Sequence, residues 1–164
     1  MKKQICFNVK VCIVTIVLLF IITGCNKTAK VIDTSYFIST SAKYGYNLTD
    51  VSSDPSIDLE ALFGYKVLEY YMLNSEDISI GFIRSDNLEN AEGIYTDIKN
   101  DRKQTFESEG SQGVESNNDL SNKYVLDTDD CYLSIIRKEK MVFFVVAMPS
   151  ETTNAKKMIN EIDI

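Results

Sequence analysis

The sequence predicts an α+β domain in which helices pack on one face of an antiparallel sheet. Two pairs of short apolar runs, at residues 65–84 and 131–148, each enclose a polar turn and are followed by a segment with helical periodicity. Nothing in this order requires parallel strands, so antiparallel pairing is the simpler arrangement. The pattern suggests two strand–turn–strand–helix units, which either an internal duplication or ordinary helix packing would produce.

In the first half, residues 34–44 favour a short helix that stops at Gly45, and residues 46–51 favour a short strand before a turn at 52–57. Residues 65–73 and 78–84 are typical of hairpin strands around a turn at 74–77. A helix is expected over 87–106, with Ser85 or Asp86 as its N-cap. Its apolar stripe would consist of Leu88, Ala91, Ile94, Tyr95, Ile98 and Phe106.

In the second half, residues 107–121 have almost no apolar side chains, which predicts a long mobile surface loop. Residues 124–127 favour a short strand, and 131–137 and 141–148 a second hairpin around 138–140. Since 141–148 is apolar at every position, we expect both of its faces to be covered, or a place in the middle of the sheet. Ser150 would cap a final helix to Ile162, with the stripe Ala155, Met158, Ile159 and Ile162.

The start of the chain has the layout of an export signal. Lys2, Lys3 and Lys10 precede an apolar run at 11–22 that ends at Thr23-Gly24-Cys25, and no acid lies among these residues. The run is about a dozen residues long, whereas a membrane-spanning helix needs about 20. A signal peptide is therefore favoured over a permanent span.

The residues Ile22-Thr23-Gly24-Cys25 resemble the lipobox of bacterial lipoproteins, and the resemblance covers only the start of the chain. It implies that residues 1–24 are removed as a signal peptide and that diacylglycerol is attached to the Cys25 sulfur. Two acyl chains make a stable anchor, so the protein would be held on a membrane, facing outside the cytoplasm. Residues 25–33 would be the lipidated cysteine and its tether, and 34–164 a single domain. The alternatives are a cleaved signal with a chance cysteine and an uncleaved anchor helix.

Charge and cysteine content restrict the partners that we expect. Loss of the first 24 residues leaves 14 basic residues against 24 acids, a net charge of −10. So acidic a surface repels nucleic acid and anionic headgroups. The expected partners are the membrane, through lipid on Cys25, and an unidentified protein, peptide or small ligand. Cys131 would have no disulfide partner, and its apolar neighbours predict a buried thiol.

The chain lacks the residues on which most enzyme mechanisms depend. Histidine is absent, which removes the usual general base and the commonest zinc ligand, and the glycines form no phosphate-binding motif. We therefore expect no catalytic, cofactor-binding or metal-binding residue. Asp127, Asp129 and Asp130 lack the EF-hand spacing, which favours a solvated turn over a calcium site. Glu69, within an apolar strand, is better explained by an edge or solvent-facing position than by catalysis.

Five tyrosines concentrate in the first half of the domain and have two interpretations. They either line a ligand groove or, as favoured here, pack in the core with their hydroxyls at its edge; they are Tyr44, Tyr46, Tyr65, Tyr70 and Tyr71. The sequence thus favours a non-enzymatic binding or interaction module on the cell envelope. There are two alternatives. One is a small enzyme that works through two carboxylates. The other is a structural subunit of a membrane complex, which would show a flat apolar patch on its surface.

Overall fold

A computed structural model describes residues 32–107 and 111–162, which contain one seven-stranded sheet in the order β1-β2-β3-β7-β6-β5-β4. Every neighbouring pair in the sheet is antiparallel. The predicted α+β class is therefore confirmed. The strands are β1 (Thr49–Asp50), β2 (Val67–Asn74), β3 (Ile78–Ser85), β4 (Val114–Asn118), β5 (Ser121–Asp127), β6 (Tyr132–Lys138) and β7 (Met141–Ala147).

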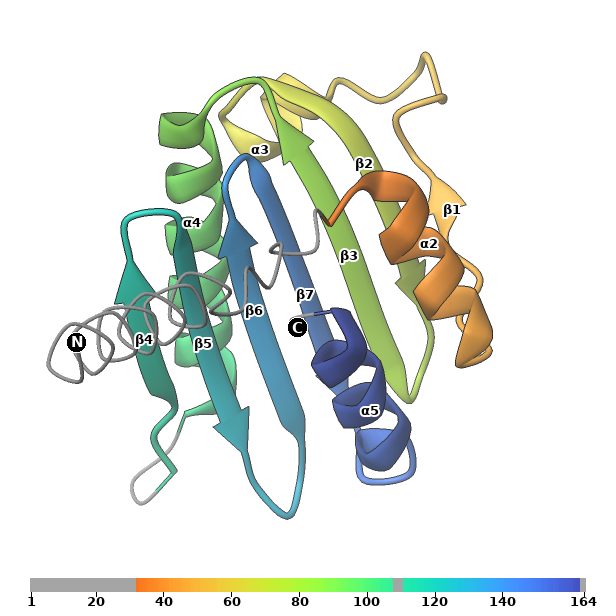
Figure 1. The fold of residues 1–164 in the computed structure, drawn as a ribbon, viewed down its shortest axis with the longest axis vertical. Helices are drawn as coiled ribbons and strands as arrows, with labels where there is room; N and C mark the ends of the chain where they lie inside the picture. Colours follow the sequence, from red (N-terminus) through yellow and green to blue (C-terminus); the bar gives the residue numbers. More distant parts are fainter. Residues whose placement is uncertain (1–31, 108–110, 163–164) are drawn as a thin grey trace, which may run out of the picture. The chain divides into compact units, whose positions relative to one another are not determined.

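The sheet consists of two meanders that meet in its middle. β1, β2 and β3 form one, β4 to β7 form the other, and β3 pairs with β7 in a register that places Phe82 opposite Phe143. Between the meanders, the helix α4 (Leu88–Phe106) carries the chain from β3 to the far edge of the sheet, where β4 lies (Figure 1). Both predicted hairpins, β2–β3 and β6–β7, are confirmed.

Helices cover both faces of the sheet, so the prediction of helices on one face is wrong. α2 (Thr34–Lys43) and α5 (Thr152–Ile162) lie on one face, and α4 with the short α3 (Leu59–Phe63) lies on the other (Figure 1). The first core includes Phe37 of α2 and the second Ile94 of α4. The apolar run of β7 explains this arrangement, because Phe143 faces one core and Phe144 the other. The position of β7 in the middle of the sheet, with both faces covered, was predicted.

Two equivalent strand–turn–strand–helix units are not confirmed. The chain does contain β2–β3–α4 and β6–β7–α5 in succession. However, β3 and β7 are antiparallel neighbours, and a twofold axis that exchanges such strands is perpendicular to the sheet. It would place both helices on one face, whereas α4 and α5 pack into opposite cores.

The helix ends agree with the sequence only in part. α2 ends before Gly45, whose φ of 90° requires the left-handed region, as the predicted glycine stop implies. The N-cap of α4 is Asn87, which accepts a 2.8 Å hydrogen bond from the Asn90 backbone N–H. The predicted caps Ser85 and Asp86 are therefore wrong. α5 begins at Thr152, two residues after Ser150, so Ser150 does not occupy the capping position either.

The segment predicted as a mobile loop, 107–121, contains β4. This five-residue strand pairs with β5 along its whole length, and all five of its side chains are exposed. Because an exposed edge strand buries no side chain, it has no apolar alternation that the sequence could reveal. β5 itself begins at Ser121, three residues before the predicted strand. The short helix α3 was also not predicted.

The apolar stripes of the two long helices are largely as predicted. All four residues of the α5 stripe are buried, and in α4 Ala91, Ile94 and Tyr95 are buried, while Leu88 is 45% exposed. Ile32 is buried and Asp33 caps α2, so the folded part includes two residues that precede the predicted boundary at 34. Cys25 and the predicted signal sequence lie outside the described residues. Within the described ranges, no helix has the length and apolarity of a membrane span.

Candidate functional site

Two adjoining cavities lie beside α4, with volumes of about 370 and 440 Å³. They share the lining residues Tyr70, Arg102 and Phe144, and we call the two neighbouring cavities together the trough. The first cavity extends towards the β2–β3 turn, and the second extends towards α3. Pockets that bind small ligands have volumes in this range.

Side chains of the sheet form the floor of the trough. Alternation along β2 turns Tyr70 and Met72 towards α4, and β7 contributes Phe144. Phe144 pairs across β3–β7 with Gly81, where an added Cβ would lie 2.3 Å from the Phe144 ring. The missing side chain of Gly81 thus gives the aromatic ring its place in the floor.

The walls come from α4 and α3. Ile94, Ile98, Arg102 and Phe106 follow one another at four-residue steps on α4, and all four line the trough. At 1.5 Å per residue, this row is about 18 Å long. On the opposite wall, Phe63 of α3 contacts Tyr70 edge-on, with ring centroids 5.1 Å apart.

Arg102 lies where the two cavities join. Its Cζ is 6.0 Å from the centroid of the Phe144 ring, a cation–π arrangement. Its Nε is buried and has no hydrogen-bond partner among the described residues, although an Asp101 carboxylate oxygen lies 3.7 Å away. A buried donor without a partner costs about 1–3 kcal/mol. A ligand acceptor would recover part of that cost only where it displaces the groups that cover this nitrogen.

Tyr70 adds a second donor beside Arg102. Burial raises the pKa of Tyr70, and the positive charge of Arg102 opposes that shift only partly. The phenol therefore remains protonated at neutral pH and can donate a hydrogen bond. The middle of the trough thus combines a guanidinium and a hydroxyl above an aromatic floor.

Four acids lie around these donors. Glu76 and Asp77 belong to the first cavity, and Asp97 and Asp101 to the second, against the single basic residue Arg102. All four acids are exposed, and no aspartate or glutamate of the described chain is buried. The desolvated carboxylate that the two-carboxylate enzyme hypothesis expects is therefore not found within these ranges.

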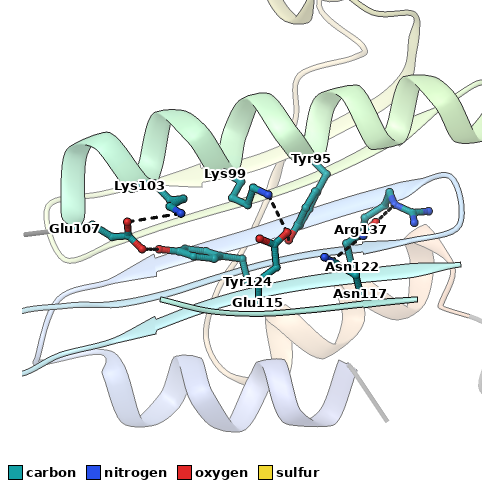
Figure 2. Close-up of polar contacts among 9 residues, drawn as sticks. All are labelled: Tyr95, Lys99, Lys103, Glu107, Glu115, Asn117, Asn122, Tyr124 and Arg137. Atoms are coloured by element: carbon teal, nitrogen blue, oxygen red, sulfur yellow. Dashed lines mark hydrogen bonds and ion pairs between the residues drawn. The ribbon is translucent and has the colours of Figure 1, made fainter. Parts of the chain in front are cut away.

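A second set of polar contacts lies on the other side of α4 (Figure 2). Tyr95, Lys99 and Lys103, at four-residue steps, project from the helix towards β4 and β5. Lys99 Nζ donates to Glu115 Oε1 at 2.8 Å, and the Tyr95 hydroxyl donates to the same oxygen at 3.4 Å. These contacts attach the exposed strand β4 to the helix.

The second half of this set centres on Glu107. The Tyr124 hydroxyl donates to Glu107 Oε1 at 2.6 Å, and Lys103 Nζ lies 3.7 Å from Oε2. The hydrogen bond from Tyr124 lowers the pKa of Glu107, as the hydrogen bond from Lys99 lowers the pKa of Glu115. Burial, in turn, raises the pKa values of Tyr95 and Tyr124. The carboxylates thus remain charged and the phenols protonated at neutral pH.

Arg137 is a buried cation held by neutral acceptors. It is 3% exposed, its Nε donates to Asn122 Oδ1, and its Nη1 donates to the carbonyls of Leu120 and Glu139 at 3.5 and 3.3 Å (Figure 2). These carbonyls belong to the β4–β5 and β6–β7 turns. Arg137 therefore joins two hairpin turns, and the contacts of Figure 2 as a whole organise the fold.

No family model, curated protein or solved structure matches this chain.

The residues singled out from the sequence are dispersed in the structure. The β5–β6 turn contains Asp129 and Asp130. Asp127 is the last residue of β5 and forms a 2.6 Å ion pair with Lys156. The described residues contain no group of three acids or cysteines arranged to hold a metal ion. Cys131 is free and 5% exposed, in agreement with the prediction of a buried thiol.

Glu69 is held by partners and is not an exposed edge residue. The β2–β3 register places it opposite Arg84, with which it forms an ion pair, and the Thr34 hydroxyl also donates to it. The hydrogen bond from Arg84 lowers the pKa of Glu69. These contacts explain a carboxylate in an apolar strand.

Most of the predicted tyrosines pack against the cores, as expected. The Tyr46 ring is buried and its hydroxyl donates to Glu151 at 2.6 Å, and the Tyr44 hydroxyl donates to Glu161 at 2.9 Å. Tyr70 is also buried, but it lines the trough as well, so both interpretations hold for this residue. Arg102 was not among the predicted residues. Arg102 is the one charged position in the four-residue series Ile94, Ile98, Arg102, Phe106, and this signal becomes interpretable only beside the cavities that the structure shows.

Proposed function

We propose that this protein is an exported lipoprotein, anchored to a membrane by lipid on Cys25, whose folded domain is a non-enzymatic binding module. The trough is its ligand site. The observation that carries the proposal is the meeting of the two cavities at Arg102, which has a donor without a hydrogen-bond partner among the described residues. An apolar depression with a few convergent polar groups is the usual form of a ligand site.

The anchor and the trough support the same role. Lipid on Cys25 would keep the domain beside the membrane, where a trough can capture a molecule that approaches the cell. The aromatic floor supplies apolar contact area, and Arg102 with Tyr70 fixes the orientation of polar groups.

A tryptophan reporter tests the proposal, since the natural chain contains no tryptophan. Leu62 lines the trough and is 59% exposed, so Leu62→Trp places a fluorophore at its rim. Val114→Trp is the matched control, because Val114 is 73% exposed on β4, at the opposite edge of the sheet. The full chain in neutral detergent would be titrated with pooled hexapeptides, with laurate and with a panel of small aromatic compounds.

We expect a saturable change in emission from Leu62→Trp with at least one of these ligands, and none from Val114→Trp. The same ligand should raise the unfolding temperature of the unmodified protein, because it binds only the folded state. If all three ligand sets leave the Leu62→Trp emission and the unfolding temperature unchanged, or if both reporters respond alike, the trough is not the binding site.

A further inference from the structure

Building on the proposed function of the trough, we propose that its ligand is a short, extended peptide segment that is apolar and positively charged. Three properties of the trough bear on this choice: its length, its central donors and its acids. Each restricts the ligand in a different way.

The length of the trough suits a segment of a chain. The row from Ile94 to Phe106 rises by about 18 Å, which an extended peptide covers with about five or six residues at about 3.3 Å each. The two cavities lie on either side of Arg102, and both contain aromatic side chains. Alternate side chains of one extended segment can fill them in turn.

The central donors suit a peptide backbone. Arg102 and Tyr70 offer N–H and O–H groups to a ligand that lies across the junction of the cavities. A backbone carbonyl accepts such hydrogen bonds and carries no net charge. The absence of charge matters here because Asp101 lies 3.7 Å from Arg102 and would repel an anionic group bound at the same place.

The acids select positive charge on the segment. Glu76 and Asp77 lie at one end of the trough, and Asp97 and Asp101 lie on the α4 wall towards the other end, against the single cation Arg102. A lysine or arginine side chain can reach an acid at either end while its neighbours occupy the apolar floor. The same acids disfavour fatty acids and anionic lipids, which match the floor but not the charge.

Three hexapeptides of equal length test the ligand class: one that alternates lysine with leucine and phenylalanine, one with glutamate in place of lysine, and one with lysine and serine only. Binding would be measured by fluorescence anisotropy on the full chain in neutral detergent. We expect the first peptide to bind at least about tenfold more tightly than either of the others, because only it matches both the floor and the acids.

A charge-matched pair of variants tests the site. Asp97→Asn with Asp101→Asn removes two trough acids and retains their shape, and we expect about three- to tenfold weaker binding of the first peptide. The control is Asp129→Asn with Asp130→Asn, which removes the same charge from two exposed acids outside the trough. This control should bind as the unmodified protein does, and unfolding temperatures would verify that both variants fold.

Failure of this inference differs from failure of the proposed function. Equal or tighter binding of the glutamate peptide, or an equal loss of affinity in both double variants, would overturn the choice of a cationic peptide. If laurate alone gave the Leu62→Trp response, the trough would remain a ligand site but for an anionic amphiphile. No response of that reporter to any ligand would overturn both.

Discussion

Two buried serines of the sheet have opposite hydrogen-bonding situations. Ser134 on β6 is fully buried, and its hydroxyl has no hydrogen-bond partner among the described residues. Ser85 on β3 is equally buried, but its single O–H is shared between the carbonyls of Asn87 and Lys140, which lie 2.7 and 3.2 Å from the oxygen. A buried hydroxyl costs free energy unless it is hydrogen-bonded, so the same substitution should have opposite effects at the two positions.

We expect Ser134→Ala to raise the free energy of unfolding by about 1 kcal/mol, because it removes an unsatisfied polar atom at nearly constant volume. Ser85→Ala should lower it by about 1 kcal/mol, since the hydrogen bond of the buried hydroxyl is lost. Urea denaturation of both variants measures the difference. A loss of stability in Ser134→Ala as large as that in Ser85→Ala would show that the Ser134 hydroxyl has a partner, such as buried water.

At the scale of elements, strand β4 depends on side-chain contacts with α4. Its five residues are exposed, so hydrophobic burial contributes little, and its backbone pairs with β5 on one side. Glu115 provides the link to the helix through Lys99 and Tyr95. The sequence of 107–121 reveals none of this, because the partners lie on α4, 16 and 20 residues away along the chain.

Glu115→Gln should therefore destabilise the protein at neutral pH, by about 1 kcal/mol after allowance for partial solvent screening. The hydrogen bond from Lys99 holds the folded pKa of Glu115 below its ordinary value of 4.5. The contribution of the carboxylate is thus complete above about pH 4.5 and declines as the pH falls through the folded pKa. Thermal unfolding of the natural protein and of the variant should converge at low pH.

The matched control for this prediction is Glu92→Gln, because Glu92 is an exposed glutamate of α4, the helix that Glu115 contacts. We expect it to follow the natural protein across the pH range. A stability difference between Glu115→Gln and the natural protein that does not change with pH would assign the effect to packing and not to the charge of Glu115.

The elements also show where sequence reasoning succeeded. Both hairpins and the α5 stripe were predictable, because alternating or continuous apolar residues record local burial. The predicted N-cap of α4 was one or two residues too early. Ser85, Asp86 and Asn87 are all residue types that cap helices well, and only the geometry of the folded helix selects Asn87. Arg102 was missed because its position in an apolar series has meaning only once the cavities beside it are known.

At the scale of the whole molecule, the prediction concerns location. Lipid on Cys25 would fix the domain to a membrane, while the acids outnumber the basic residues along the chain. Such a domain is repelled by anionic headgroups, so that the covalent anchor and not the protein surface would hold it there.

Cys25→Ala should abolish the lipid-bearing mature form, leaving precursor or released protein. Mass spectrometry of the membrane fraction measures the amount of the lipid-bearing mature form. Cys12→Ala is the control, because residue 12 belongs to the predicted signal peptide and its replacement should give a mature protein of unchanged mass. Lipid-bearing mature protein in Cys25→Ala cells would refute the anchor.

By itself, the sequence determined the α+β class, the two hairpins and the buried stripe of α5, because each depends on a local pattern of burial. The location of the helices on both faces depended on how β3 and β7 meet, and these strands are separated by 55 residues or more along the chain. The trough likewise combines side chains from α3, β2, β3, α4 and β7, elements that together span residues 59 to 147. Only tertiary packing decides such features, since no local pattern records which distant side chains share a surface.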